Sequence, residues 1–130
     1  MNQKIATSNA PAAIGPYSQA IAAGGFLFTS GQIALVPGTG ALDIADIETE
    51  THRVMKNLKA VLEAGNASFN HVVKTTIFLS DMAHYAQVNE VYASYFTKDA
   101  PAREAVQVAG LPKGVNVEIS MIACLDNFEK

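Results

Sequence analysis

Hydrophobic residues in the first third of the chain occur in two short runs, residues 19–23 and 26–30, which are separated by Gly24 and Gly25. Short apolar runs on either side of a two-glycine turn are typical of a β-hairpin. The chain is then expected to continue extended over residues 32–36 and to form a Pro- and Gly-marked loop after that. This part of the chain is therefore predicted to be β-structure.

From Asp46 onward, apolar residues recur at intervals of three and four, the spacing that predicts an amphipathic helix. Asp46 is the expected N-cap, because its side chain can accept a hydrogen bond from the first turn. Gly65 is expected to end the helix in the left-handed conformation. The same spacing predicts a second helix over residues 84–96, with Ser80 and Asp81 as its cap.

Three further segments are predicted to be strands. Residues 72–79 are rich in β-branched and aromatic side chains. Residues 104–108 and 115–125 lie on either side of a turn at residues 111–114 and are expected to pair as a hairpin. The order of elements predicts a single α+β domain over residues 1–130, a mixed sheet with both helices packed on one face. Two helices cannot cover the second face, which therefore needs a partner.

The composition agrees with a covered second face. Of the 130 residues, 49% are hydrophobic and 16% are charged, whereas an average soluble domain has about 25% charged residues. The formal net charge is −3 and no basic cluster is present, which disfavours nucleic acid as a partner. No stretch reaches the roughly 20 apolar residues of a membrane span, and the first residues do not resemble a signal peptide, so a cytoplasmic location is expected.

The residue types that form metal and nucleophile sites are spread apart in this sequence. His52, His71 and His84 have no second ligand at the i+3 or i+4 position, so no metal site is expected. Cys124 is the single cysteine, which excludes an internal disulfide, and its apolar neighbours indicate a small core residue. Ser30 does not lie in a nucleophile-elbow motif.

Arg103 and Glu118 are charged residues in otherwise apolar segments. Arg103 begins one predicted strand, and Glu118 interrupts the last strand between Val117 and Ile119. Either residue by itself fits an ordinary exposed position. If the two strands pair as a hairpin, however, both side chains reach the same end of the sheet. The guanidinium would then bind a substrate carboxylate, and the glutamate would handle a proton or a water.

Five motifs extend this picture: AIGPYSQA at residues 13–20, TSGQI at 29–33, PAR at 101–103, LP at 111–112 and VEI at 117–119. In this order they resemble the Rid family, also called the YjgF family, over essentially the whole chain. The resemblance implies a chorismate-mutase-like fold that assembles as a homotrimer, with sheets inside, helices outside and sites in the clefts between subunits. It also implies a deaminase that hydrolyses enamine and imine intermediates, such as 2-aminoacrylate and 2-iminobutyrate, to 2-keto acids and ammonia without a cofactor.

The same resemblance assigns roles to individual residues. Arg103 would grip the substrate carboxylate, Glu118 would be associated with the hydrolytic water, and Tyr17 and Ser30 would line the pocket. Gly31 and Asn89 also fall on positions that match the family pattern and are the further residues assigned to the substrate-binding site.

Two departures from the family pattern bear on activity and on pocket size or substrate preference. Ala105 occupies the position of the substrate pocket where many deaminase members have a cysteine. If that position contributes through its backbone groups, activity is retained, whereas a role for the thiol would affect activity. The segment 97–100, which precedes the PAR motif, is shorter than in some relatives.

Two other functions are consistent with the same resemblance. One is a regulatory or chaperone-like protein that binds a small metabolite without turnover, and the other is a ribonuclease or translation inhibitor. The presence of both Arg103 and Glu118 favours catalysis, because a carboxylate receptor gains nothing evident from a glutamate beside an anionic ligand. A ribonuclease would need a basic surface, which the net charge of −3 does not favour.

Overall fold

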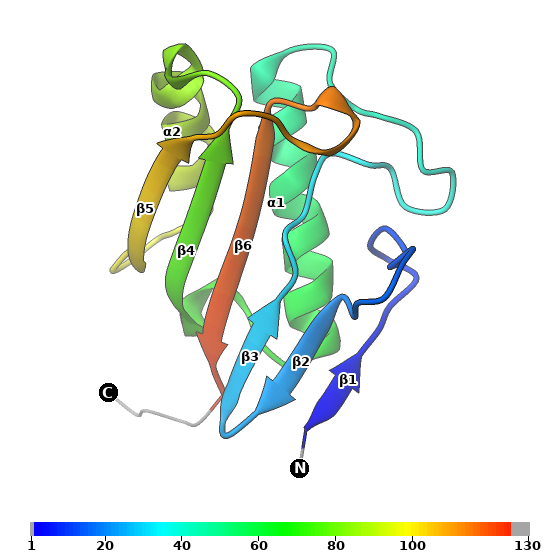
Figure 1. The fold of residues 1–130 in the computed structure, drawn as a ribbon. Coiled ribbons are helices and arrows are strands. Elements are labelled where there is room, and N and C mark those ends of the chain that lie inside the picture. Colours follow the sequence, from blue (N-terminus) through cyan, green and yellow to red (C-terminus); the bar gives the residue numbers. More distant parts are fainter. Residues whose placement is uncertain (1, 126–130) are drawn as a thin grey trace.

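The computed structural model describes residues 2–125, which form one six-stranded sheet and two α-helices (Figure 1). The strands follow one another across the sheet in the order β1-β2-β3-β6-β4-β5. β4 and β5 run parallel, and the other neighbouring pairs run antiparallel. The elements are β1 (Gln3–Ile5), β2 (Ala20–Ala23), β3 (Phe26–Thr29), α1 (Ile47–Ala64), β4 (Val72–Leu79), α2 (Tyr85–Ala93), β5 (Ala102–Gln107) and β6 (Val117–Cys124).

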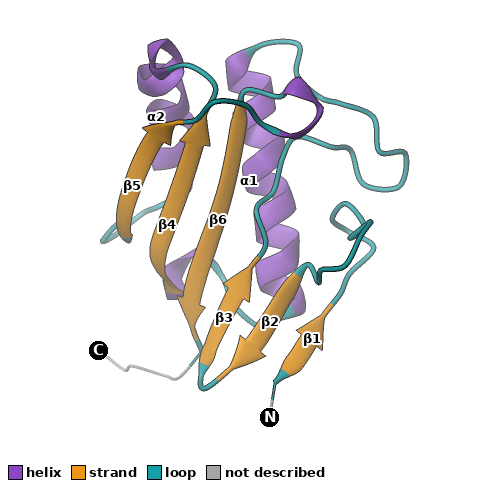
Figure 2. Ribbon diagram, in the orientation of Figure 1, coloured by secondary structure: helices purple, strands orange, loops and turns teal. Residues whose placement is uncertain are grey.

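Both helices lie on the same side of the sheet (Figure 2). The hydrophobic core fills the space between the two layers, where Met55 and Leu58 of α1 meet Leu27 of β3, Ile77 of β4 and Ile119 of β6. All five side chains are fully buried or nearly so. The structure therefore confirms the predicted α+β class, with two helices on one face of a mixed sheet.

Most strands lie where the sequence pattern predicts them. The hairpin around the two glycines is present as β2 and β3, and β4 begins and ends at the predicted residues. β6 alternates between buried and half-buried residues over most of its length, as expected. Residues 32–36, by contrast, do not add a strand to the sheet. Gln32 forms an isolated bridge with Ile119, and Leu35 forms another with Leu42.

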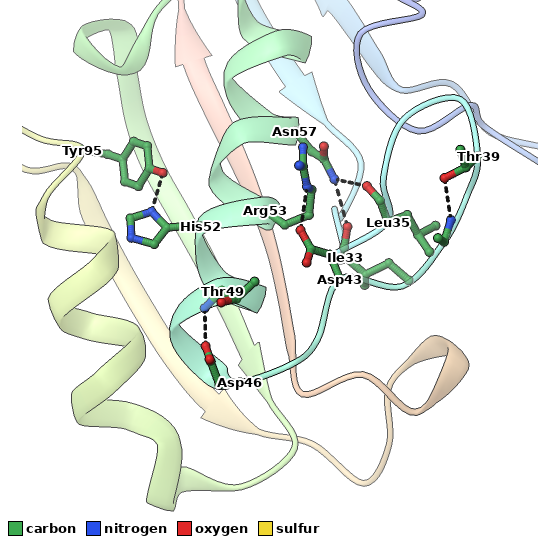
Figure 3. A network of polar contacts seen from close by, with 11 residues as sticks. Ile33, Leu35, Thr39, Asp43, Asp46, Thr49, His52, Arg53, Asn57 and Tyr95 are labelled. Atoms are coloured by element: carbon green, nitrogen blue, oxygen red, sulfur yellow. Dashed lines mark hydrogen bonds and ion pairs between the residues drawn. The ribbon is translucent and has the colours of Figure 1, made fainter.

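The long helix begins as predicted and ends differently. The Asp46 carboxylate accepts a hydrogen bond from the Thr49 backbone N–H at 2.7 Å (Figure 3). The prediction of a left-handed Gly65 is wrong: Gly65 has a φ of −96°, and Asn66, with a φ of 63°, is the left-handed residue. Close packing explains the glycine instead, because a Cβ at position 65 would lie 2.8 Å from Cδ2 of Leu27.

The second helix is shorter than predicted. α2 ends at Ala93, and a short 3₁₀ turn, Met82–His84, precedes it. Asp81 caps that turn by accepting a hydrogen bond from the Ala83 N–H at 2.8 Å. The aromatic residues after Ala93 are outside the helix, although Phe96 still packs against the core.

The predicted hairpin between the last two strands is wrong. β4 lies between β5 and β6 and pairs with both of them. The connection over residues 108–116 crosses the end of β4, a distance of about 10 Å for two inter-strand spacings. β4, α2 and β5 consequently form a parallel crossover unit, which brings the helix close to β5.

The face of the sheet opposite the helices has no further layer among residues 2–125 and carries large apolar side chains. Phe28 is 44% exposed and Val106 is 42% exposed. Phe78, opposite Val106 on the neighbouring strand, lies on the same face. We call this surface the open face.

Candidate functional site

Arg103 is held in a polar and aromatic setting on the helix-covered face. It lies opposite Thr75 of β4, whose side chain is buried under the helices. Its Nη1 donates a hydrogen bond to Oδ1 of Asn89 at 2.7 Å, and its Nη2 donates one to the Tyr85 hydroxyl at 2.8 Å. The guanidinium carbon lies 5.6 Å from the ring centre of Tyr85 and 5.2 Å from that of Tyr92, within the range of cation–π attraction.

No carboxylate neutralises Arg103 within residues 2–125. The ion pairs in this part of the chain join Arg53 to Asp43 and Lys74 to Glu104. A guanidinium has five N–H groups; two are used here, which leaves three for a ligand. Arg103 also lines a pocket of about 460 Å³, in which the described part of the chain places no acidic residue. The other lining residues are Asn89, Tyr92, Ala93, Phe96, Lys98, Ala100 and Pro101. This arrangement suits a carboxylate ligand.

Glu118 lies on the open face in apolar surroundings. It is opposite Phe78 of β4, which is in turn opposite Val106 of β5, so the three side chains form one row across the sheet. Burial raises the pKa of the Glu118 carboxyl above its usual range, because an apolar environment disfavours the charged form. Glu118 therefore retains its proton to a higher pH than an exposed glutamate does.

Glu118, Gly31 and Tyr17 line a second pocket, of about 410 Å³. The bridge between Gln32 and Ile119, with a hydrogen bond of 2.8 Å from Gln32 N to Ile119 O, places Gly31 beside Glu118. A Cβ at position 31 would lie 2.8 Å from Cδ of Glu118. Glycine is therefore needed at this position so that the carboxyl group can lie against the backbone.

Two side chains of α1 fix the loop that follows β3. Nδ2 of Asn57, a fully buried residue, donates hydrogen bonds to the carbonyl oxygens of Ile33 at 3.1 Å and Leu35 at 3.0 Å (Figure 3). Nε of Arg53 pairs with the Asp43 carboxylate at 3.1 Å. These contacts connect one wall of the second pocket to the most buried helix of the fold.

A buried carboxylate fixes the N-terminal end of β6. Oε2 of Glu50, a fully buried residue of α1, accepts hydrogen bonds from the backbone N–H groups of Asn116 at 2.7 Å and Val117 at 3.1 Å. Its Oε1 accepts a third from Nδ2 of Asn116 at 2.9 Å. Because Glu118 is the next residue along the strand, this carboxylate also sets the position of Glu118.

Ser30 and Ala105, two of the predicted site residues, line neither pocket. The Ser30 hydroxyl donates a hydrogen bond to the Ser18 carbonyl oxygen at 2.6 Å and so ties β3 to the segment that carries Tyr17. Ala105 shares the helix-covered face with Arg103 and packs against the hydrophobic core.

The structure divides the predicted site between two faces of the sheet. Arg103 and Glu118 are opposite Thr75 and Phe78 of β4, respectively. These two residues are three positions apart along one strand, an odd number that places them on opposite faces. The prediction that Arg103 and Glu118 meet at one end of the sheet is therefore wrong within a single chain.

The sequence reasoning missed the roles of Tyr85 and Tyr92. Together with Asn89, they recur at helical spacing and face Arg103 across the crossover unit. That spacing was visible in the sequence, but aromatic residues on a helix face usually pack into a core. Only the parallel pairing of β4 and β5 reveals that this face of α2 meets an arginine.

The described residues include no group of three or more His, Cys, Asp or Glu side chains that could hold a metal ion. Two histidines have local partners: His52 Nδ1 lies 2.7 Å from the Tyr95 hydroxyl, and His71 Nδ1 accepts a hydrogen bond from the Ser68 N–H at 3.0 Å. Cys124 is buried, as predicted. None of the helices in residues 2–125 is long and apolar enough to cross a membrane.

Comparison with known proteins identifies the family. Residues 7–125 match the family described as endoribonuclease L-PSP. A RutC family protein of Pyrococcus horikoshii is 53% identical over 123 residues, which cover 95% of this chain and 98% of that relative. The chain belongs to this family, the Rid family.

Two further members of the family are similar to this chain in sequence or in fold. The mouse 2-iminobutanoate/2-iminopropanoate deaminase is 47% identical over 126 residues, covering 97% of this chain and 93% of the mouse protein. The crystal structure of E. coli TdcF with bound serine superposes with a TM-score of 0.90 at 41% identity, covering 94% of this chain and 98% of TdcF. These findings confirm the family and the fold that the sequence motifs predict.

Proposed function

We propose that this Rid family protein hydrolyses reactive enamine and imine acids, such as 2-aminoacrylate and 2-iminobutyrate, to 2-keto acids and ammonia. The observation that carries the proposal is Arg103, a half-buried cation. Among residues 2–125, three of its N–H groups have no partner and no acidic residue lines its pocket. Two relatives support it. The mouse protein is named as a deaminase of this substrate class, and TdcF binds serine, which also carries a carboxylate.

Arg103 would act by orientation. In these substrates the reacting carbon is bonded directly to the carboxylate carbon, so a bidentate guanidinium–carboxylate pair fixes its position. When the reacting carbon is held next to a bound water, the addition of water becomes effectively unimolecular, which lowers the entropic part of the barrier.

Glu118 would handle protons. An enamine first takes a proton at C3 and loses one from its nitrogen, which gives the imine. Water then adds its oxygen to the imine carbon, while a proton reaches the nitrogen. Collapse of the resulting carbinolamine forms the C=O bond and releases ammonia. The raised pKa of the Glu118 carboxyl suits a group that exchanges protons with water and substrate in these steps. The steps require no cofactor.

The complete site would lie between copies of the chain in a homotrimer. Within one chain, Arg103 and Glu118 lie on opposite faces of the sheet, so a second copy must supply the missing group. The open face, with exposed Phe28 and Val106, provides apolar surface for such a contact. A trimer would bury this surface, place the sheets inside and leave the helices outside.

Metabolite binding without turnover is the second candidate function. One relative, from Lactococcus lactis, is named as a regulator, and the Arg103 pocket alone would suffice for a carboxylate receptor. The measurement that separates the two functions is turnover. A ribonuclease, which the family description mentions, is less favoured because the chain has a net charge of −3.

The decisive experiment generates 2-aminoacrylate or 2-iminobutyrate in situ with a serine/threonine dehydratase. Loss of the intermediate is followed with and without the protein, at several protein concentrations. Acceleration in proportion to protein concentration supports the deaminase. Binding of a 2-keto acid without any acceleration would support the receptor instead.

Arg103→Ala is expected to lower kcat/KM by about 100-fold or more while the protein stays folded, because the residue lines a pocket and is not in the core. Arg103→Lys should rescue only part of this loss, since an ammonium lacks the planar fork. Lys59→Ala, which removes one positive charge from the exposed side of α1, is the matched control and should leave kcat/KM unchanged. Full activity of Arg103→Ala would show that the carboxylate anchor lies elsewhere.

A further inference from the structure

Tyr85 is an exposed tyrosine whose hydroxyl has one polar partner among the described residues, the guanidinium of Arg103. The hydroxyl accepts a hydrogen bond from Nη2 at 2.8 Å, and the ring lies beneath the guanidinium at 5.6 Å. Tyr85 begins α2, one helical turn before Asn89, which accepts the other hydrogen bond from Arg103. Two successive turns of α2 therefore present two acceptors to the same side chain.

We propose that Tyr85 is a positioning residue for the substrate carboxylate. Its hydroxyl and Oδ1 of Asn89 hold different nitrogens of the guanidinium, Nη2 and Nη1. Two anchored nitrogens fix the plane of the group, so the three remaining N–H groups keep one orientation before a ligand arrives. The inference rests on the proposed function, in which Arg103 binds the carboxylate.

The physical benefit is preorganisation. A free arginine side chain samples many rotamers, and ordering it on binding weakens affinity. Neutral acceptors order the guanidinium without neutralising it, whereas an acidic partner would compete with the substrate for its charge. Tyr85 as a residue is 37% exposed, so its hydroxyl contributes little to the core and is available for this role.

The hydroxyl groups of the two neighbouring tyrosines, Tyr92 and Tyr95, have other hydrogen-bond partners. The Tyr92 ring also stacks on Arg103, but its hydroxyl donates to Oγ1 of the buried Thr75 at 2.9 Å and serves the fold. The Tyr95 hydroxyl lies 2.7 Å from Nδ1 of His52 on α1 (Figure 3). Tyr85 is the tyrosine of this segment whose hydroxyl touches the guanidinium.

The test is Tyr85→Phe, which keeps the ring and removes the hydroxyl. We expect KM for the imine and Kd for 2-oxobutyrate, a product that needs no turnover to be measured, to rise together by about three- to tenfold. kcat should stay within about twofold, because the carboxylate is bound alike in the ground and transition states. Calorimetry gives Kd, and the dehydratase-coupled assay gives KM and kcat.

Tyr95→Phe is the matched control. It removes a hydroxyl with one hydrogen bond from the same segment of chain, away from Arg103, and should leave KM and Kd unchanged. Thermal unfolding of both variants separates a change in binding from a change in folding.

The results for Tyr85→Phe and for the wild-type protein test the positioning role and the deaminase proposal separately. Unchanged KM and Kd in Tyr85→Phe would overturn the positioning role, and so would a loss of kcat alone, since that would place the hydroxyl at the reacting atoms. If the wild-type protein binds 2-oxobutyrate but turns over no imine, the deaminase proposal fails, while weaker binding by Tyr85→Phe still supports the positioning role. If the wild-type protein does not bind 2-oxobutyrate at all, both proposals fail.

Discussion

Glu118 connects the local environment of one side chain to the pH dependence of stability. Its pKa is raised in the folded protein by burial, whereas in the unfolded chain it stays near the ordinary value of 4.5. Between these two pKa values the folded state binds more protons than the unfolded state. The free energy of unfolding therefore falls as the pH rises through this interval.

Glu118→Gln is expected to remove this pH-dependent loss, because the amide has about the same shape and stays neutral. At pH 4 the variant and the wild type should be about equally stable. At pH 7.5 the variant should be more stable by about 0.5–1 kcal/mol, a modest gain because the carboxyl is partly exposed and screened by solvent. Urea unfolding at both pH values, at one protein concentration, measures the difference. An equal or lower stability of the variant at pH 7.5 would contradict the assignment of the raised pKa.

Single residues also show where sequence reasoning succeeds. Arg103 and Glu118 could be selected because a charge in an apolar segment needs a reason, and the structure places each in a pocket. Tyr85 could not be selected in the same way. A tyrosine at helical spacing satisfies a hydrophobic pattern whether its hydroxyl serves a site or merely meets water.

Elements in this fold are joined by a few buried polar contacts, of which the Glu50 carboxylate is the clearest. It accepts three hydrogen bonds from Asn116 and Val117 and so joins α1 to the start of β6. Removing the carboxylate leaves three donors without this acceptor, the buried N–H of Val117 and two partly buried groups of Asn116. A buried donor without an acceptor costs about 1–3 kcal/mol.

Glu50→Ala is therefore expected to lower the free energy of unfolding by about 3 kcal/mol or more. Glu50→Gln keeps one acceptor oxygen and should cost less. Glu63→Ala, on the exposed side of the same helix, is the control and should change stability by about 0.5 kcal/mol or less. The three variants are compared by denaturant unfolding. A loss for Glu50→Ala as small as that of Glu63→Ala would show that the start of β6 is held by its strand neighbours alone.

The sequence pattern predicts the helices and strands of this fold better than it predicts which strands are neighbours. Alternation and helical spacing report which side of an element is buried, and they located β4 and α1 to within a residue or two. They carry no information on which strand lies beside which. The turn before β6 suggested a hairpin, but burial of the apolar β4 on both edges favours its place between β5 and β6. That single difference separates the strands of Arg103 and Glu118, and the register across β4 places the two side chains on opposite faces.

In the whole molecule, the Arg103 and Glu118 pockets lie on opposite faces of the sheet, so contact with a second copy is needed to combine them. The low fraction of charged residues and the apolar open face both agree with burial against other copies. A cyclic trimer would form three equivalent sites, each with Arg103 from one copy and Glu118 from its neighbour. This arrangement makes a prediction that no single-chain site shares.

Mixing two inactive variants should restore activity. Subunits with Arg103→Ala still carry Glu118, and subunits with Glu118→Ala still carry Arg103. The two variants are refolded together in equal amounts. A site is then intact when its Arg103 comes from a Glu118→Ala subunit and its Glu118 comes from an Arg103→Ala subunit, which happens in about one site in four. We therefore expect about a quarter of the wild-type imine hydrolysis from the mixture and close to none from either variant alone.

Two measurements make this result interpretable. Light scattering must show that the mixture and each variant have the mass of three copies, because a monomer would remove the shared site altogether. A variant that carries both substitutions, mixed with wild-type protein in the same way, controls for refolding losses. If each site drew both residues from one copy, the mixture of single variants would stay inactive at any ratio, since no subunit in it holds both side chains. Recovery of activity therefore depends on Arg103 and Glu118 meeting across a subunit boundary.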